Sequence, residues 1–86
     1  INILEVEVGT TGFCGGDRGH GCETTLKLTD LTSTSWDVRV KDRYADSKIE
    51  QPESVEITFY GDCELHTFLE ALRFAVKKIE DTIEKG

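Results

Sequence analysis

The spacing of the apolar residues changes once along the chain, and this change limits the folds that the chain can adopt. Before residue 61, apolar and polar side chains alternate in short runs, which is the pattern of half-buried strands. From Glu64 onward the apolar residues recur three or four positions apart, which is the pattern of an amphipathic helix. Several strands followed by a single helix predict the α+β class.

The alternating segments define the expected strands. They span residues 3–8, 24–31, 36–40 and 55–59. The short polar run at 32–35 predicts a hairpin between the second and third strands. The longer polar run at 42–54 contains the only proline, and we expect an exposed loop there.

The helical segment carries its apolar residues on one stripe. These are Leu65, Phe68, Leu69, Leu72, Ala75, Val76, Ile79 and Ile83. Asp62 follows Gly61 and is expected to cap a helix of roughly 20 residues, about 30 Å long. We therefore expect one domain over residues 1–86: a four-stranded, mostly antiparallel sheet with one C-terminal helix packed on one face.

Composition excludes several classes of partner. The net charge is −7, so no broad basic patch is expected for a nucleic acid duplex. No apolar run approaches the ~20 residues of a membrane-spanning helix, and no secretory signal is visible. The three cysteines are an odd number, which favours a reducing compartment over a disulfide scaffold, although a Cys14–Cys22 bridge stays open.

Glycine is concentrated between the first two expected strands. Six of the eight glycines lie within residues 9–21. Glycine lowers stability through backbone entropy, so such a cluster indicates that the backbone must adopt unusual conformations or approach a ligand closely. Successive N–H groups in a loop of this kind converge on anions. The sequence therefore predicts a non-catalytic binding site for a small phosphorylated ligand. The predicted site residues are Phe13, Gly15, Gly16, Asp17, Arg18, Gly19, His20 and Gly21.

Each side chain of this loop has an expected role. Arg18 and His20 add charge-assisted bonds to a phosphate. Asp17 accepts a bond from a ribose hydroxyl or orients His20, and Phe13 stacks on a base or anchors the loop on the core. The loop lacks the G-K-[ST] ending of a P-loop, and a strand rather than a helix follows it, which excludes a dinucleotide-binding turn.

Two alternatives remain for the loop. Cys14, Asp17, His20 and Cys22 offer four zinc ligands, although their spacing matches no standard zinc motif. A protein-interaction module is the other alternative. We expect no enzyme activity and no cofactor, because a chain this small has little room to enclose a substrate.

The glycine-rich loop also resembles a segment of known proteins. The segment Phe13-Cys14-Gly15-Gly16-Asp17-Arg18-Gly19-His20-Gly21, set between two strands, resembles a group of small phage and prophage proteins. In size and compactness the chain is similar to phage proteins that act as sponges for bacterial immune signals. This resemblance implies sequestration of a nucleotide-derived messenger, such as an ADP-ribose derivative or a cyclic nucleotide, in the bacterial cytoplasm. The acidity of the chain favours a ligand with one or two phosphates.

A second copy of the chain is also expected. Phe74 lies opposite the apolar stripe of the helix, with Ala71 near the same side, and the outer face of the expected sheet has no cover. These features predict a homo-oligomer. The resemblance implies the same, because the phage sponges are oligomeric.

Overall fold

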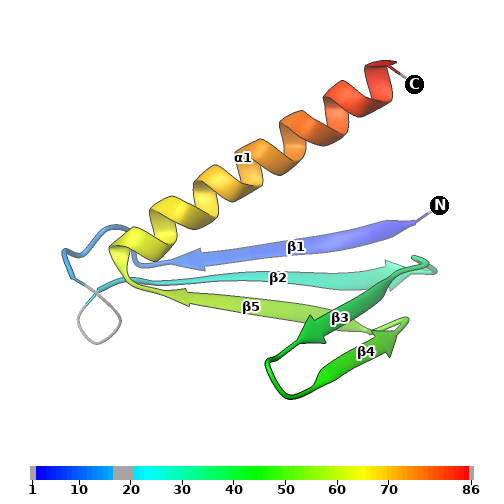
Figure 1. Ribbon diagram of the computed structural model, residues 1–86, viewed down its shortest axis with the longest axis horizontal. Helices are drawn as coiled ribbons and strands as arrows, with labels where there is room; N and C mark the ends of the chain where they lie inside the picture. Colours follow the sequence, from blue (N-terminus) through cyan, green and yellow to red (C-terminus); the bar gives the residue numbers. More distant parts are fainter. Residues whose placement is uncertain (1, 17–20, 86) are drawn as a thin grey trace. The chain divides into compact units, whose positions relative to one another are not determined.

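A computed structural model describes residues 2–16 and 21–85 of the chain. In this part of the chain, five strands precede one helix (Figure 1). The elements are β1 (Ile3–Thr10), β2 (Glu23–Thr32), β3 (Asp37–Lys41), β4 (Asp46–Glu50), β5 (Ser54–Tyr60) and α1 (Asp62–Lys85). The α+β class and the single C-terminal helix are therefore confirmed. No helix among the described residues has the length and apolar character needed to cross a membrane.

The chain divides into two compact units. The first, here called the sheet unit, comprises Ile1–Gly9 and Thr25–Ile57. The second, the loop–helix unit, comprises Thr10–Thr24 and Thr58–Gly86. Buried residues within the described ranges are Cys22, Thr24, Gly61 and Leu65, and all four belong to the loop–helix unit.

The strands form two sheets rather than one. The larger sheet has three strands in the order β1-β2-β5, with β2 in the centre and its neighbours antiparallel to it (Figure 1). Central strands lose exposure on both edges, and most of β2 is accordingly half-buried, whereas β1 at the edge is exposed along its length. The alternation that predicts these three strands is confirmed.

The prediction of a four-stranded sheet is wrong, because β3 pairs with β4 in a separate two-stranded sheet. The pairing is antiparallel and sets Val38 opposite Ile49. Strand β4 lies inside the polar run that was expected to be a loop, and β3 does not form the expected hairpin with β2. Strand β4 has a single strongly apolar residue, Ile49, so alternation could not reveal it.

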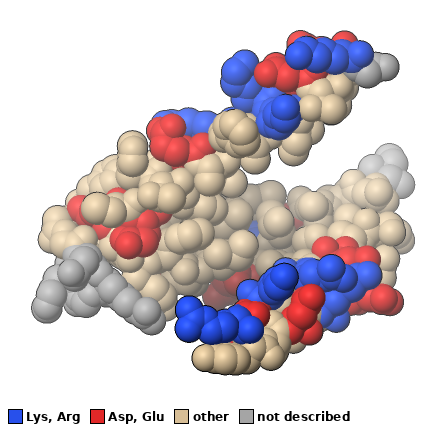
Figure 2. All heavy atoms as spheres, in the orientation of Figure 1, with Lys and Arg blue, Asp and Glu red and all other residues tan. Residues whose placement is uncertain are grey.

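The hairpin of β3 and β4 buries little apolar surface, and charged side chains form ion pairs across it. Basic and acidic side chains intermingle over β3 and β4 (Figure 2). Across the two strands, Lys48 Nζ lies 3.5 Å from an Asp37 carboxylate oxygen, and Arg39 Nε lies 3.8 Å from one of Asp46. Such cross-strand pairs stabilise a register even where few apolar groups are buried.

The open end of the hairpin is closed by hydrogen bonds from its flanking residues. Trp36 is half-buried, and its indole N–H donates to the Pro52 carbonyl at 3.0 Å. The Gln51 N–H donates to the Trp36 carbonyl at 2.9 Å. These bonds give the aromatic side chain a partner for its one polar group, as expected of a half-buried indole.

In the loop–helix unit, α1 begins against the end of β5. The Leu65 N–H donates to the Gly61 carbonyl at 3.1 Å, which makes Gly61 the residue that precedes the first helical turn. Leu65 is 6% exposed. One turn later, the Phe68 ring stacks on Phe59 of β5, with 4.4 Å between ring centroids. These contacts fix the first two turns of α1 within this unit.

Candidate functional site

The base of the glycine-rich loop is closed by hydrogen bonds between threonines and backbone groups. The loop follows β1 and returns into β2 (Figure 1). The Thr11 N–H donates to the Glu23 carbonyl at 3.2 Å, and the Glu23 N–H donates to Thr11 Oγ1 at 3.1 Å. The hydroxyls of Thr10 and the buried Thr24 lie 2.7 Å apart. Both sides of the loop are therefore fixed at the point where they leave the strands.

Above this base, the loop backbone binds a carboxylate of the same chain. The Cys14 N–H donates to Asp62 Oδ1 at 3.1 Å, and the Gly15 N–H donates to Asp62 Oδ2 at 2.6 Å. In return, the Asp62 N–H donates to the Gly16 carbonyl at 3.1 Å. Three consecutive loop residues are thus joined to the first residue of α1.

The conformation of Gly15 makes this contact possible. Its φ angle is 78°, in the left-handed region that residues with a side chain rarely adopt. A Cβ at this position would meet no atom within 4 Å, so backbone conformation rather than space requires glycine there. This observation explains one of the clustered glycines in physical terms.

The two N–H donors also change the ionisation of Asp62. Hydrogen bonds from Cys14 and Gly15 lower the pKa of the Asp62 carboxyl below its ordinary value, because they stabilise the carboxylate form. The side chain expected to cap α1 therefore points to the loop, as a charged acceptor. Gly61, rather than Asp62, provides the carbonyl of the first helical hydrogen bond.

Cys22 is buried at the junction of the loop and the helix. Its thiol donates to the Gly61 carbonyl at 3.2 Å, and the Gly61 N–H donates to the Cys22 carbonyl at 2.8 Å. Burial raises the pKa of the Cys22 thiol, and the side chain of Asp62 raises it further. The Cys22 side chain is therefore held as a neutral thiol against the start of α1.

The other two cysteines are exposed, and all three are free. The Cys14 Sγ lies 3.4 Å from the Gly12 carbonyl oxygen and 3.5 Å from Thr11 Oγ1. The bridge between Cys14 and Cys22 that the sequence left open is thus not formed here.

The structure describes half of the predicted ligand-binding residues. Phe13 is 63% exposed, so it does not anchor the loop on the core. Gly15 and Gly16 lie at the contact with Asp62, and Gly21 is half-buried next to Cys22. The remaining predicted residues lie outside the described part of the chain. They are Asp17, Arg18, Gly19 and His20.

The zinc alternative also depends on residues outside the described part of the chain. Asp17 and His20, two of its four ligands, lie outside the described residues. Among the residues that are described, no group of three or more His, Cys, Asp or Glu side chains is placed to hold a metal ion. Cys14 and Cys22 direct their thiols to different carbonyl groups.

The sequence did not reveal the role of Asp62. The acid lies 47 positions from Gly15 in the chain, and its place directly before the helical stripe fits an ordinary capping residue. Thr10, Thr11 and Thr24 were likewise assigned no role. The only local indication is that polar β-branched residues stand on both sides of the loop.

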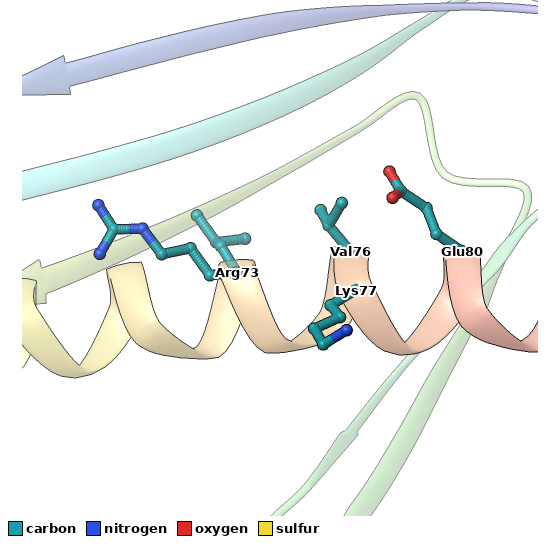
Figure 3. Close-up of a pocket in the computed structure, with 5 residues that line it drawn as sticks. Arg73, Val76, Lys77 and Glu80 are labelled. Carbon is teal, nitrogen blue, oxygen red and sulfur yellow. The ribbon is translucent and has the colours of Figure 1, made fainter.

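A groove along α1 lies outside the loop. It has a volume of about 340 Å³, and its lining residues all belong to the helix (Figure 3). They are Leu72, Arg73, Val76, Lys77 and Glu80. The groove is therefore a feature of the helix surface and contributes nothing to the binding of a ligand by the loop.

Comparison with known proteins adds no relative: no family model, curated protein or solved structure matches this chain.

Proposed function

We propose that the protein captures a small phosphorylated, nucleotide-derived ligand through its glycine-rich loop without transforming it. The observation that supports this proposal most is the pair of backbone N–H groups, of Cys14 and Gly15, that converge on the carboxylate of Asp62. Successive backbone N–H groups that converge on an anion are the feature of anion-binding nests. We extend this property to the rest of the loop.

Within the proposal, the phosphate binds beyond the residues that hold Asp62. A second anion beside this carboxylate would be repelled, since like charges a few ångströms apart are unfavourable. The N–H groups of residues 16–21 then hold the phosphate, and Arg18 and His20 add charge-assisted bonds. Asp17 accepts a bond from a ribose hydroxyl or orients His20. Asp62 serves as the anchor that keeps the loop in a conformation able to bind.

The exposed Phe13 supplies an apolar wall for the ligand. A side chain 63% exposed, one residue before Cys14, is available to stack on a base. Aromatic stacking of this kind contributes about 1–3 kcal/mol per base in proteins that bind single-stranded nucleic acids. Phosphate binding by the loop and stacking on Phe13 together favour a nucleotide-derived ligand over inorganic phosphate.

The biological role that we propose follows the resemblance to phage sponges. A protein that binds a nucleotide-derived immune signal without cleaving it lowers the free concentration of that signal in the bacterial cytoplasm. Such a role requires neither a catalytic group nor a cofactor.

A thermal-shift and calorimetric panel tests this function. The ligands are ADP-ribose, a cyclic dinucleotide, a cyclic trinucleotide and inorganic phosphate. A ligand present at 100 times its dissociation constant stabilises the folded protein by about 2.7 kcal/mol, so binding gives a clear rise in melting temperature. Arg18→Ala and His20→Ala should abolish the shift, and Phe13→Ala should reduce it for ligands that carry a base.

Arg43→Ala is the matched control for Arg18→Ala. Arg43 lies in the turn between β3 and β4, in the sheet unit, so its removal changes the net charge equally but leaves the loop intact. Absence of a shift with every nucleotide, or an equal shift for Arg18→Ala and the unchanged protein, would refute the proposal.

A protein-interaction module is a second candidate, and the exposure of Phe13 also favours it. Buried aromatic anchors contribute much of the energy in protein interfaces. This candidate predicts a stable complex with a partner protein that Phe13→Ala weakens, and no thermal shift with any nucleotide. Native mass spectrometry of the purified protein separates the two, since it detects a co-purified ligand, a partner or a bound zinc ion.

A further inference from the structure

The apolar residues of α1 have the spacing of a coiled coil. Successive positions on the stripe are four, three, four, three and four residues apart, which is the alternation of a heptad repeat. The residues are Leu65, Leu69, Leu72, Val76, Ile79 and Ile83. In heptad notation, Leu69, Val76 and Ile83 occupy a positions and the other three occupy d positions. We call this stripe the α1 seam.

The residues of the α1 seam become more exposed toward the C-terminal end of the helix. The exposed fraction rises from 6% at Leu65 to 39% at Leu72 and 71% at Ile83. Every residue from 71 to 80 is exposed. Apolar side chains in a continuous exposed stripe favour association, because contact with another apolar surface removes them from water.

Two opposite charges flank the exposed part of the seam on one side. Arg73 and Glu80 follow Leu72 and Ile79 directly, so both occupy e positions one heptad apart. Their side chains project from the same side of α1 as Val76 (Figure 3). Within the described residues Glu80 forms no ion pair, whereas Arg73 has only an exposed contact of 3.2 Å with Glu70.

We propose that α1 pairs through this seam with α1 of a second copy of the chain, in antiparallel orientation. A twofold axis perpendicular to the two helices sets the e side of one against the e side of the other. Arg73 of each copy then faces Glu80 of its partner, which gives two equivalent ion pairs. The seam places Val76 beside Ile79 of the partner and Leu72 beside its Ile83.

The charges distinguish this arrangement from a parallel pair. In a parallel coiled coil, e residues face g residues of the partner. The g positions here are Phe68, Ala75 and Thr82, all uncharged. A parallel pair would therefore leave Arg73 and Glu80 without partners, while the antiparallel pair satisfies both.

The length of the seam sets the strength of the expected dimer. In this register the paired part of the seam runs from Leu72 to Ile83, less than two heptads and about 18 Å of helix. This is shorter than the three to four heptads of a sustained coiled coil. We therefore expect a weak, reversible dimer that becomes weaker at high salt, since its ion pairs are exposed.

Sedimentation of the full chain over a range of concentrations tests the proposal. Arg73→Glu or Glu80→Arg alone replaces both attractive pairs with like charges and should weaken the dimer about tenfold. The double variant Arg73→Glu with Glu80→Arg exchanges the charges and should restore the dimer. Asp81→Arg is the matched control: it makes the same charge change as Glu80→Arg at an f position, away from the seam, and should have little effect.

Each other outcome contradicts the proposal. A monomer at every concentration would mean that the seam does not bind a second copy of the chain. A dimer unaffected by the single charge reversals, or one that the double variant does not restore, would mean a different interface. Circular dichroism confirms that each variant keeps its helix. The readout is mass, so its result is independent of the ligand proposed for the loop.

Discussion

The two ends of α1 have the same amphipathic pattern but different surroundings. At its start, Asp62 binds the loop backbone, Leu65 is buried, and Phe68 stacks on Phe59. In the later turns, all residues from 71 to 80 are exposed, including apolar ones of the same stripe. One periodic pattern therefore describes both a packed segment and an exposed one.

The comparison shows what periodicity specifies. The repeat of apolar residues determines which side of the helix avoids water, because it depends only on the angle between successive side chains. It does not determine which surface covers that side. At the start of α1 the covering residues come from β5 and the loop; for the later turns we propose a second copy of α1.

The largest expected difference between the two ends is in the effect of removing an apolar side chain. Leu65→Ala should lower the free energy of unfolding by about 2–5 kcal/mol, because it leaves a cavity where the side chain is buried. Phe74→Ala, at an exposed position in the later turns, should change it by less than about 0.5 kcal/mol. Urea denaturation measures both. Equal losses would contradict the contrast between the two ends.

The next effect concerns the loop that packs against the start of α1. Gly15→Ala places a side chain on a residue with φ of 78° and should destabilise the protein by about 1–2 kcal/mol. Gly9→Ala is the matched control, since it has no such φ angle and no atom near the added Cβ, and it should have a smaller effect. Thermal denaturation compares the two. A harmless Gly15→Ala would show that the loop does not require the left-handed conformation.

A pH effect tests the anchor between the loop and the start of α1. Because the pKa of the Asp62 carboxyl is lowered in the folded protein, its contribution to stability is present above the ordinary Asp pKa of about 3.9. That contribution is lost as the pH falls through the lower value of the folded state. Asp62→Asn should remove this part of the acid dependence, and Glu64→Gln, in the same helical turn, should retain it. Denaturation midpoints between pH 2 and 7 measure the difference.

The smallest effect is expected for a surface ion pair in the later turns. Lys77 Nζ lies 3.3 Å from an Asp81 carboxylate oxygen, and both side chains are exposed. Lys77→Ala should lower stability by no more than about 0.5 kcal/mol, because exposed pairs of this spacing are weak. A loss as large as that of Leu65→Ala would show that the later turns pack within the monomer.

The sequence predicted the elements that depend on local periodicity. Strands β1, β2, β3 and β5 and helix α1 all lie where the apolar pattern indicated. Strand β4 was missed because its pairing depends on charges such as Lys48 and Asp46, which lie across the hairpin from their partners. Since β3 pairs with β4, the strands form two sheets instead of the single sheet that the pattern predicted.

The candidate site was predicted in part. Within the predicted cluster, the Gly15 N–H donates to the carboxylate of Asp62 in the same chain. Binding of an external ligand by the loop stays a prediction. The contact with Asp62 joins residues 47 positions apart, which no local pattern reveals. The roles of Asp17, Arg18 and His20 remain predictions.

A pH titration of the Gly15 backbone amide by NMR tests most directly whether Asp62 anchors the loop. If the Gly15 N–H donates to the Asp62 carboxylate, its proton resonance should lie downfield and move upfield as the carboxyl is protonated. The midpoint should fall below the ordinary Asp pKa of about 3.9, and the transition should vanish in Asp62→Asn. A Gly15 amide that does not titrate, or that titrates unchanged in Asp62→Asn, would contradict the account.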